Sequence, residues 1–296
     1  MDIEKYIAEK KKKIDEALEK FLPKKDVEPK SLALAMHYSV LAGGKRIRPI
    51  LTLATAEACE GEVNLVLPTA CAIELIHTFT LIHDDLPAID NSDLRRGKPS
   101  CHKAYGDATA ILAGDALMPF AFGIILKNTD LKKIKGEVVM GVLEEICDAI
   151  GIQGVIGGEE MDLKLEGKET EEDEVMKMYS RKTGALIQAA VRCGAMLSKA
   201  KMAMLSDLTR FSEHLGIAFQ IKDDILDVES VELEVGKPVQ EDVKKGKASY
   251  PLVVGIEKAK EKAKNEIDSA IKALERFGKN ADPLRGIARY IIERNK

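Results

Sequence analysis

The hydrophobic positions of this chain recur every three or four residues over most of its length, which is the spacing of helices with one buried face. The spacing is clear from the start, in IEKYIAEKKKKIDEALEKF. It predicts helices at 3–21, 31–42, 49–59, 68–86, 105–126, 131–150, 171–198, 201–227, 249–274 and 282–295. Two stretches, 68–86 and 183–197, are apolar on most of their circumference, so we expect them in the middle of a helical bundle.

Glycine and proline mark the breaks between these predicted helices. Gly43 and Gly44 follow one helix, Pro49 opens the next, and Pro68 opens another, because proline is tolerated in a first turn. The longest stretch without a helical pattern is 228–248, and a loop of this length inside a compact domain usually has a function. No linker or repeat divides the chain. Prolines number only ten and aromatic residues make up 4%, so we predict one all-α domain over residues 1–296.

Composition narrows the class of protein. Hydrophobic residues are 45%, charged residues 32% and the net charge is −4, values that suit a soluble globular protein and argue against a nucleic-acid partner. The five cysteines are scattered without a CxxC pair, which favours reduced thiols over disulfides or a zinc site. The charged N-terminus does not resemble a signal peptide, and no uninterrupted apolar run reaches about 18 residues. We therefore expect a cytoplasmic protein without stable membrane association.

An acidic cluster, HDDLPAID, follows the most apolar predicted helix. Asp84 and Asp90 are six positions apart, about 240° around an ideal helix, and would face different directions. Pro87 disfavours helical geometry at Leu86, so the helix must end or distort, and the distortion can return Asp90 towards Asp84. Carboxylates at a helix C-terminus, here including Asp85, also oppose the helix dipole. The cluster is therefore expected to need a cation.

A second acidic cluster, QIKDDILD, closes another long apolar helix. Asp223 and Asp227 are one turn apart on the same face, with Asp224 beside them, and like charges at that spacing repel. A single cluster is equally consistent with a helix end followed by a solvated acidic loop. Two clusters favour a site for Mg²⁺, which binds a few carboxylate oxygens while it keeps water and phosphate oxygens.

Basic residues flank both acidic clusters. They are Lys45, Arg46 and Arg48 in LAGGKRIRP, Arg95 and Arg96 in DLRRGKP, and Arg181 and Lys182 in RKTG. The first block is not a phosphate-binding P-loop, because Ser39 stands where that motif needs glycine. Each basic residue alone would usually be a solvated surface group. Together with metal ions they suit two diphosphates, and the neighbouring apolar helices suggest ionisation of a hydrocarbon diphosphate.

These blocks also carry a family resemblance. The chain resembles the trans-isoprenyl diphosphate synthases, or polyprenyl synthetases, over essentially its whole length. The matching blocks are GGKRIRP, IELIHTFTLIHDDLPAIDNSDLRRGKPSCHKAYGDATAILAGDAL, GGEEMDL, RKTG, FQIKDDILD and GKASYPLV. The resemblance implies a homodimeric all-α fold with a central cavity, in which prenyl chains are extended head to tail.

The resemblance assigns the aspartates to two metal-binding motifs. It makes Asp84, Asp85 and Asp90 the first motif, in its long DDxxxxD form, and Asp223, Asp224 and Asp227 the DDxxD motif. Asp84, Asp90, Asp223 and Asp227 are the expected Mg²⁺ ligands, while Asp85 and Asp224 are weaker candidates. Three Mg²⁺ ions are expected when substrate is bound.

The resemblance also implies two diphosphate sites. The isopentenyl diphosphate site comprises Lys45, Arg48, His77 and Arg96, and the allylic diphosphate site comprises Arg95, Lys182, Lys237 and Lys247. The oxygens of Thr183 and Gln220 are expected to face the developing allylic cation. A lone histidine on an apolar helix is usually a core residue, but the position of His77, seven before Asp84, favours a ligand role, whereas His83 is interpreted as structural. No side chain is an obvious base, and the resemblance assigns proton removal to the released diphosphate.

The predicted length of the product depends on Phe79 and Thr80, which lie just before the first motif. In members of the family, residues at this place close the tunnel that receives the growing prenyl chain. Phe79 together with DDxxxxD resembles bacterial farnesyl diphosphate synthases (C15 product), although core packing equally explains an aromatic residue there. A geranylgeranyl diphosphate synthase (C20) is the alternative. A class I terpene cyclase is less consistent, because it needs Ser or Thr and then Glu where Asp227 and Val231 stand. A non-catalytic subunit would lack one aspartate motif. Lys237 and Lys247 further suggest that 228–248 closes over substrate.

Overall fold

The computed structural model describes residues 1–233 and 248–294, and almost all of its regular structure is helical. The all-α prediction is confirmed. The α-helices are α1 (Ile3–Phe21), α2 (Lys30–Val40), α3 (Ile47–Ala58), α4 (Val63–Asp84), α5 (Cys101–Tyr105), α6 (Asp107–Asn128), α7 (Gly136–Ile150), α8 (Val155–Leu165), α9 (Glu172–Tyr179), α10 (Ala185–Leu197), α11 (Met202–Leu233), α13 (Tyr250–Val254), α14 (Ile256–Ala273) and α15 (Asp282–Glu293). A π-helical turn (Ser180–Gly184), a 3₁₀ turn (Lys279–Ala281) and a hairpin of β1 (Leu94–Arg95) and β2 (Lys98–Pro99) complete the described elements.

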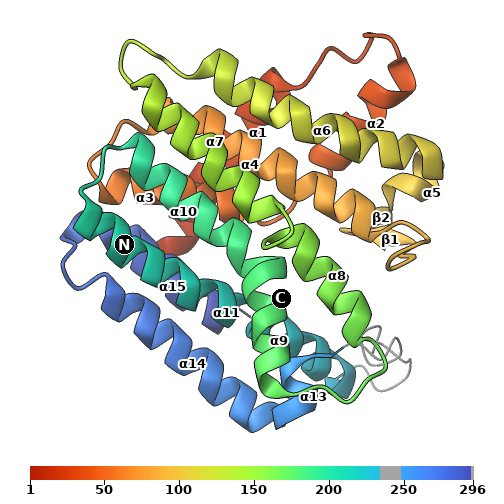
Figure 1. The fold of residues 1–296 in the computed structure, drawn as a ribbon, viewed down its shortest axis with the longest axis vertical. Helices are drawn as coiled ribbons and strands as arrows, with labels where there is room; N and C mark the ends of the chain where they lie inside the picture. The colour runs from red at the N-terminus through yellow and green to blue at the C-terminus, as the bar shows by residue number, and fades with distance from the viewer. Residues whose placement is uncertain (234–247, 295–296) are drawn as a thin grey trace.

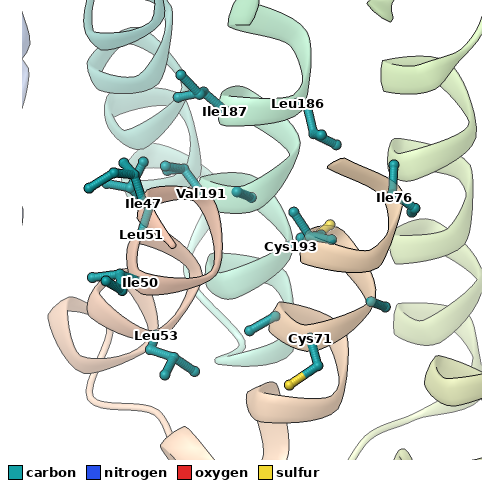
Figure 2. Close-up of a cluster of buried hydrophobic side chains, with 14 of the residues drawn as sticks. Ile47, Ile50, Leu51, Leu53, Cys71, Ile76, Leu186, Ile187, Val191 and Cys193 are labelled. Carbon is teal, nitrogen blue, oxygen red and sulfur yellow. The ribbon is translucent and has the colours of Figure 1, made fainter. Parts of the chain in front are cut away.

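The long helices pack side by side in the order α6, α4, α10, α11 and α14 (Figure 1). Helix α4 lies between α6 and α10 in this series and is buried over most of its length, as predicted for a helix inside the bundle. Figure 2 shows apolar side chains of α3, α4 and α10 drawn together, among them Leu51, Ile76 and Val191, all fully buried. Gly194 lets α10 approach α3 closely, because a Cβ there would lie 2.5 Å from the carbonyl oxygen of Thr52.

Several helix boundaries differ from the sequence prediction, including the following three. Helix α4 begins at Val63, so Pro68 lies inside the helix instead of opening it. Helix α11 continues to Leu233, so the predicted non-helical stretch is wrong at 228–233. The predicted helix 249–274 is two helices, because Gly255 takes a left-handed conformation with φ +87°. At these three places the local signals did not predict the observed helix boundary.

The sequence prediction missed α8 entirely. Its segment contains Gly157 and Gly158, and glycine inside a helix costs about 1 kcal/mol relative to alanine. The packing shows why glycine is needed: a Cβ on Gly158 would lie 2.2 Å from the backbone nitrogen of Lys182. The helix therefore forms against the π-helical turn that carries Lys182.

Two described helices, α4 and α6, are long and apolar enough to cross a membrane by length and composition alone. In this fold 78% of the apolar window of α4 is buried, against 39% for α6. Helix α4 is therefore apolar because it lies in the core of the bundle. The outer face of α6 instead exposes Ile111, Leu112 and Leu126.

A smaller apolar cluster lies beside the main core, where α9, α11 and α14 meet. Its buried members include Val175, Tyr179, Ile221, Ile225 and Ala263. This cluster holds the end of α9 and the following π-helical turn against α11. Residues 182–184 and 220–224 are thereby brought to one end of the bundle, where the cavity described next is found.

Candidate active site

A cavity of about 520 Å³ opens among the ends of the central helices, a size typical of small-molecule sites. Acidic and basic side chains from widely separated parts of the chain line it. The acidic ones are Glu74, Asp84, Asp90, Glu159 and Asp223, and the basic ones are Lys45, Arg46, Arg48, Arg95, Arg96, Lys182 and Arg294. Apolar residues of the wall include Ile47, Leu81, Val155 and Leu186. The cavity thus combines many charges with a hydrocarbon surface.

The first acidic cluster has the geometry that Pro87 predicted. Helix α4 ends at Asp84, and the backbone N–H of Asp90 donates to the carbonyl oxygen of Asp84 at 2.8 Å. Asp84 and Asp90 both line the cavity. Asp85 does not: its buried carboxylate accepts a bifurcated hydrogen bond from Nε of Arg95, at 3.0 and 3.1 Å, and a second hydrogen bond from Nη2. The turn therefore separates two aspartates that face the cavity from one that holds an arginine.

Asp84 stands in an environment that disfavours its negative charge. Burial raises its pKa, and the nearby carboxylate of Glu159 raises it further, in spite of Lys182. One oxygen of Glu159, Oε1, is buried without a hydrogen-bond partner among the described residues. A cation bound between these groups would relieve both conditions.

The donor set fits Mg²⁺ better than a metal held entirely by protein. Within residues 1–233 and 248–294, no three His, Cys, Asp or Glu side chains lie close enough to form a metal site alone. The carboxylates of Asp84, Asp90 and Asp223 instead reach the cavity from two sides. Mg²⁺ is commonly held in this way, by one or two carboxylates together with waters and substrate phosphates.

The second acidic cluster brings one aspartate into the cavity, Asp223. The cation expected beside it is a residue that the sequence analysis missed, Arg294, whose Nη2 donates to Oδ1 of Asp223 at 2.6 Å. The Arg294 guanidinium also stacks on the ring of Phe219, 4.5 Å from its centroid. Burial raises the pKa of Asp223, while Arg294 and Lys45 act in the opposite direction. The closing segment RYIIERNK contains this arginine but gives no sign that it would reach Asp223.

The other two aspartates of that cluster do not line this cavity. Asp224 is buried and accepts hydrogen bonds from Nε2 of Gln220, at 2.9 Å, and from the hydroxyl of Tyr179. Asp227 lies one turn further along α11. The structure therefore brings Asp84, Asp90 and Asp223 together, and a metal-ligand role for Asp227 or Asp224 stays a prediction.

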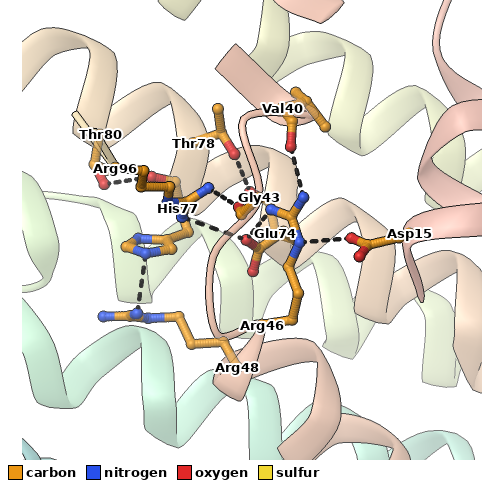
Figure 3. A network of polar contacts seen from close by, with 10 residues as sticks. All are labelled: Asp15, Val40, Gly43, Arg46, Arg48, Glu74, His77, Thr78, Thr80 and Arg96. Atoms are coloured by element: carbon orange, nitrogen blue, oxygen red, sulfur yellow. Dashed lines mark hydrogen bonds and ion pairs between the residues drawn. The ribbon is translucent and has the colours of Figure 1, made fainter. Parts of the chain in front are cut away.

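The block GGKRIRP forms the opposite wall. Nη1 of Arg48 lies 3.2 Å from Nε2 of His77 (Figure 3). Burial and the positive charge of Arg48 lower the pKa of His77, so its ring is neutral and Nε2 accepts from Arg48. Burial also lowers the pKa of Lys45, and the charge of Arg294 adds to this effect. This wall carries an excess of positive charge that an anion would neutralise.

A glycine allows Arg96 to join this wall. Arg96 donates from Nη1 to the carbonyl oxygen of Gly43. Gly44 has φ +119°, and a Cβ on it would lie 2.5 Å from Cζ of Arg96. The glycine pair thus makes room for the guanidinium as well as for the turn. The structure places all four residues of the proposed isopentenyl diphosphate site, Lys45, Arg48, His77 and Arg96, on one cavity.

Arg46 also reaches the cavity wall, but it is held by protein groups. Its Nη1 donates to Glu74 at 2.6 Å, Nε to Asp15 at 2.8 Å, and Nη2 to the carbonyl oxygen of Val40 at 2.6 Å (Figure 3). The side chains of Arg46 and Glu74 are each only 1% exposed. This network fixes the loop that presents Lys45 and Arg48.

The π-helical turn presents the remaining matched residues, as such turns often do at functional sites. Nζ of Lys182 lies 2.8 Å from Oε2 of Glu159 and 2.5 Å from Oδ2 of Asp162. Burial lowers the pKa of Lys182, but these two carboxylates outweigh it, so the net shift is upward. The hydroxyl of Thr183 donates to Oε1 of Gln220 at 2.6 Å, and both residues line the cavity. Lys237 and Lys247 lie outside the described residues.

Comparison with known proteins agrees with this geometry. Residues 29–285 match the model of the polyprenyl synthetase family. The chain is 42% identical over 293 residues to farnesyl diphosphate synthase of Geobacillus stearothermophilus, covering 99% of this chain and 97% of the relative. This chain belongs to the polyprenyl synthetase family. Members of this family are prenyltransferases that act on isopentenyl and allylic diphosphates.

Other relatives in the family differ in product. Geranylgeranyl diphosphate synthase of Cyanophora paradoxa is 41% identical, over 98% of this chain and 96% of the relative. The solved structure of an FPP/GFPP synthase from Zymomonas mobilis superimposes with a TM-score of 0.86 at 34% identity, covering 98% of this chain and 99% of that one. Overall similarity therefore establishes the polyprenyl synthetase family and leaves the chain length of the product open.

The residues proposed to set product length in this polyprenyl synthetase occupy different positions. Thr80 lines the cavity, whereas Phe79 is buried behind the wall. The Phe79 ring packs edge-on against His83, with centroids 5.6 Å apart. Nε2 of His83 lies 3.1 Å from the carbonyl oxygen of Ile111, which agrees with the structural role expected for His83. Phe79 thus lies next to Thr80 on α4, and its ring packs against a residue that contacts α6.

Proposed function

We propose that this polyprenyl synthetase is a Mg²⁺-dependent farnesyl diphosphate synthase. It joins isopentenyl diphosphate head to tail (1′-4) to dimethylallyl diphosphate and then to geranyl diphosphate, giving the C15 product and diphosphate. The observation that carries the proposal is the single cavity in which Asp84, Asp90 and Asp223 face a wall of basic residues. The aromatic Phe79 supports the shorter product over the C20 product of a geranylgeranyl diphosphate synthase.

Isopentenyl diphosphate is proposed to bind at Lys45, Arg48, His77 and Arg96. Arg48 suits this role because its Nε is buried without a hydrogen-bond partner in the described structure. Neutral His77 accepts from the same guanidinium and so fixes its plane. A planar guanidinium held in one orientation can bind a diphosphate with two parallel hydrogen bonds.

The allylic diphosphate is proposed to bind on the other side, at Arg95 and Lys182, with Lys237 and Lys247 as further expected ligands. Three Mg²⁺ ions, held with Asp84, Asp90, Asp223 and Asp227, would neutralise the negative charge of the departing diphosphate. The oxygens of Thr183 and Gln220 then face the allylic cation that the isopentenyl double bond attacks. The buried apolar wall excludes water from this cation, and the released diphosphate removes the proton.

Chromatography of the reaction products tests the proposal directly. With isopentenyl and dimethylallyl diphosphates and Mg²⁺, the purified chain alone should form a dominant C15 product. A dominant C20 peak would refute the assigned chain length but not the reaction. A chain that needs no Mg²⁺, or that forms no prenyl diphosphate by itself, would favour a different enzyme or a non-catalytic subunit.

Replacing Phe79 with alanine is expected to lengthen the product beyond C15. The change removes the ring packed against His83 and opens space in the core next to Thr80, which lines the cavity. Chain length is measured by chromatography of the products. Phe211→Ala is the control, because it removes a fully buried ring elsewhere in the same core. A Phe79→Ala enzyme that still stops at C15 would remove the chain-length role of Phe79.

A cytoplasmic homodimer is also proposed. The exposed apolar face of α6 supports this proposal. This face exposes Ile111, Leu112 and Leu126, and Met140 of α7 is exposed as well. An apolar face of this kind commonly marks an interface. Leu112→Glu is expected to shift the sedimentation coefficient from dimer to monomer, whereas Leu252→Glu, an exposed leucine on α13, should not. A wild-type chain that sediments as a monomer would contradict the dimer.

A further inference from the structure

A continuous chain of hydrogen bonds links the start of α13 to the cavity. The backbone N–H of Tyr250 lies 2.7 Å from the hydroxyl oxygen of Tyr179. Tyr179 bonds to Oδ2 of Asp224, whose Oδ1 lies 2.9 Å from Nε2 of Gln220. Oε1 of Gln220 lies 2.6 Å from the hydroxyl of Thr183. Of the residues in this series of hydrogen bonds, only Gln220 and Thr183 line the main cavity.

The direction of every hydrogen bond in this chain follows from the groups themselves. A backbone N–H can only donate, so the Tyr179 oxygen accepts from Tyr250 and its own proton goes to Asp224. An ionised carboxylate can only accept, so Asp224 must face the NH₂ side of the Gln220 amide. The amide oxygen then faces Thr183, which donates its single proton to it. The Thr183 hydroxyl therefore presents an oxygen lone pair, and no proton, to the cavity.

The orientation of Thr183 is therefore decided outside the cavity. Asparagine and glutamine amides can rotate by 180° with little change in shape, and the hydrogen-bond partners determine which way they point. If Asp224 did not hold the NH₂ group, Gln220 could turn that group towards Thr183. The Thr183 hydroxyl would then accept, and its proton would be free to point into the cavity. That arrangement would disfavour a positive charge in front of it.

Tyr179 is well placed to hold Asp224. It is only 2% exposed and lies in the apolar cluster between α9 and α11, on the side of the π-helical turn away from the cavity. Asp224, Thr183 and Tyr250 are buried too, so the hydrogen bond of the Tyr179 hydroxyl to Asp224 is largely shielded from bulk water. The hydrogen bond from Tyr179 also explains why Asp224 points away from the cavity that its neighbour Asp223 lines.

We propose that Tyr179 is a positioning residue for this reaction, acting through Asp224 and Gln220 to hold the Thr183 oxygen as an acceptor towards the allylic cation. The proposal rests on the proposed prenyl transfer. Its effect belongs to the ionisation step, when positive charge appears, and not to the binding of either diphosphate. Tyr179 touches neither substrate nor metal in this arrangement, so it is not a catalytic residue.

Tyr179→Phe tests the proposal, because it removes one hydroxyl and keeps the ring in the apolar cluster. Deleting a group that touches the transition state costs about 10²–10³-fold, so we expect a smaller loss of about tenfold in kcat from this indirect contact. The KM values for both diphosphates should be unchanged. The slow Mg²⁺-dependent hydrolysis of geranyl diphosphate without isopentenyl diphosphate should fall by the same factor, because it needs ionisation alone.

Tyr6→Phe is the matched control. The Tyr6 hydroxyl also donates to a carboxylate, Oε2 of Glu57 at 2.6 Å, but it joins α1 to α3 and does not line the cavity. It should leave kcat and the hydrolysis rate unchanged. Any general effect of losing a partly buried phenol would appear in both variants, and thermal unfolding compares their stabilities.

A double-mutant cycle separates positioning from a general structural role. Thr183→Val removes the oriented oxygen, so adding Tyr179→Phe should cause no further loss in kcat. Effects that multiply, or a Tyr179→Phe enzyme with the kcat of wild type, would overturn the proposal. If Tyr179→Phe does not fold, Asp224→Asn carries the test, because its amide no longer forces Gln220 to present NH₂, and the same two outcomes apply. A wild-type chain without prenyl transfer would instead refute the proposed function.

Discussion

Replacing Asp84 with asparagine is expected to lower kcat by about 10³-fold, because it removes a charge that is proposed to hold Mg²⁺ at the departing diphosphate. Asp84 is the last residue of α4 and lines the cavity, and its carbonyl oxygen accepts a hydrogen bond from the backbone N–H of Asp90. Asparagine keeps the shape of the side chain and removes its charge. Steady-state kinetics over a range of Mg²⁺ concentrations measures the loss, which should not be recovered at high Mg²⁺.

The same substitution is expected to raise the stability of the metal-free protein at neutral pH. Burial and Glu159 raise the folded-state pKa of Asp84 above its unfolded value, so its ionised form destabilises the fold at high pH. This destabilisation is largest above the folded-state pKa of about 8, decreases as the pH falls from there to the unfolded value of 3.8, and is absent below it. Asparagine removes it at any pH. Thermal unfolding without Mg²⁺ should therefore show a higher midpoint for Asp84→Asn, which separates lost catalysis from misfolding.

Asp93→Asn is the control for this prediction. Asp93 follows the same acidic turn, but its side chain is 74% exposed and it pairs with Lys103 at 2.7 Å. A solvent-exposed ion pair contributes little to stability, so activity and stability should both stay close to wild type. Equal losses of activity in Asp84→Asn and Asp93→Asn would contradict the metal-ligand assignment of Asp84.

Replacing Arg46 with leucine is expected to lower the free energy of unfolding by about 3–5 kcal/mol, the usual cost of leaving one charge of a buried pair without its partner. Nη1 of Arg46 lies 2.6 Å from Oε1 of Glu74, and both side chains are almost inaccessible to solvent. The next nearest cation to this oxygen is Nη2 of Arg96, at 4.0 Å. Denaturant unfolding measures the change.

Two further variants define what the Arg46 result means. Arg46→Leu with Glu74→Leu removes both charges and should recover part of the lost stability, because two apolar groups need no partner. Glu160→Gln breaks the exposed pair with Lys164, at 2.8 Å, and should change stability by less than about 1 kcal/mol. If Arg46→Leu costs no more than Glu160→Gln, the buried network does not stabilise the fold.

Much of the fold was predictable because its causes are local. Helical spacing placed α1 at its observed bounds, and the apolar circumference of α4 placed it in the core. Pro87 was enough to predict the end of α4 and the return of Asp90. Such predictions depend on a few neighbouring residues and on backbone geometry, so no knowledge of the distant chain was needed.

The failures share a different cause. Helix α8 contains residues that disfavour a helix, and it forms because Gly158 lets it pack onto the backbone at Lys182. Arg294 shows no signal in its own neighbourhood that it would reach Asp223, 71 positions earlier. In both cases the stabilising partner comes from another element, and local patterns carry no information about which elements meet.

The sequence by itself determined the helical class, the two acidic clusters and the basic blocks, because helix periodicity and side-chain chemistry are properties of short segments. Only the tertiary structure decided what each aspartate does. Asp84, Asp90 and Asp223 face one cavity, whereas Asp85 is held by Arg95 and Asp224 by Tyr179 and Gln220. Adjacent aspartates are chemically identical, and their roles differ because a buried carboxylate takes the partner that the packed helices place beside it.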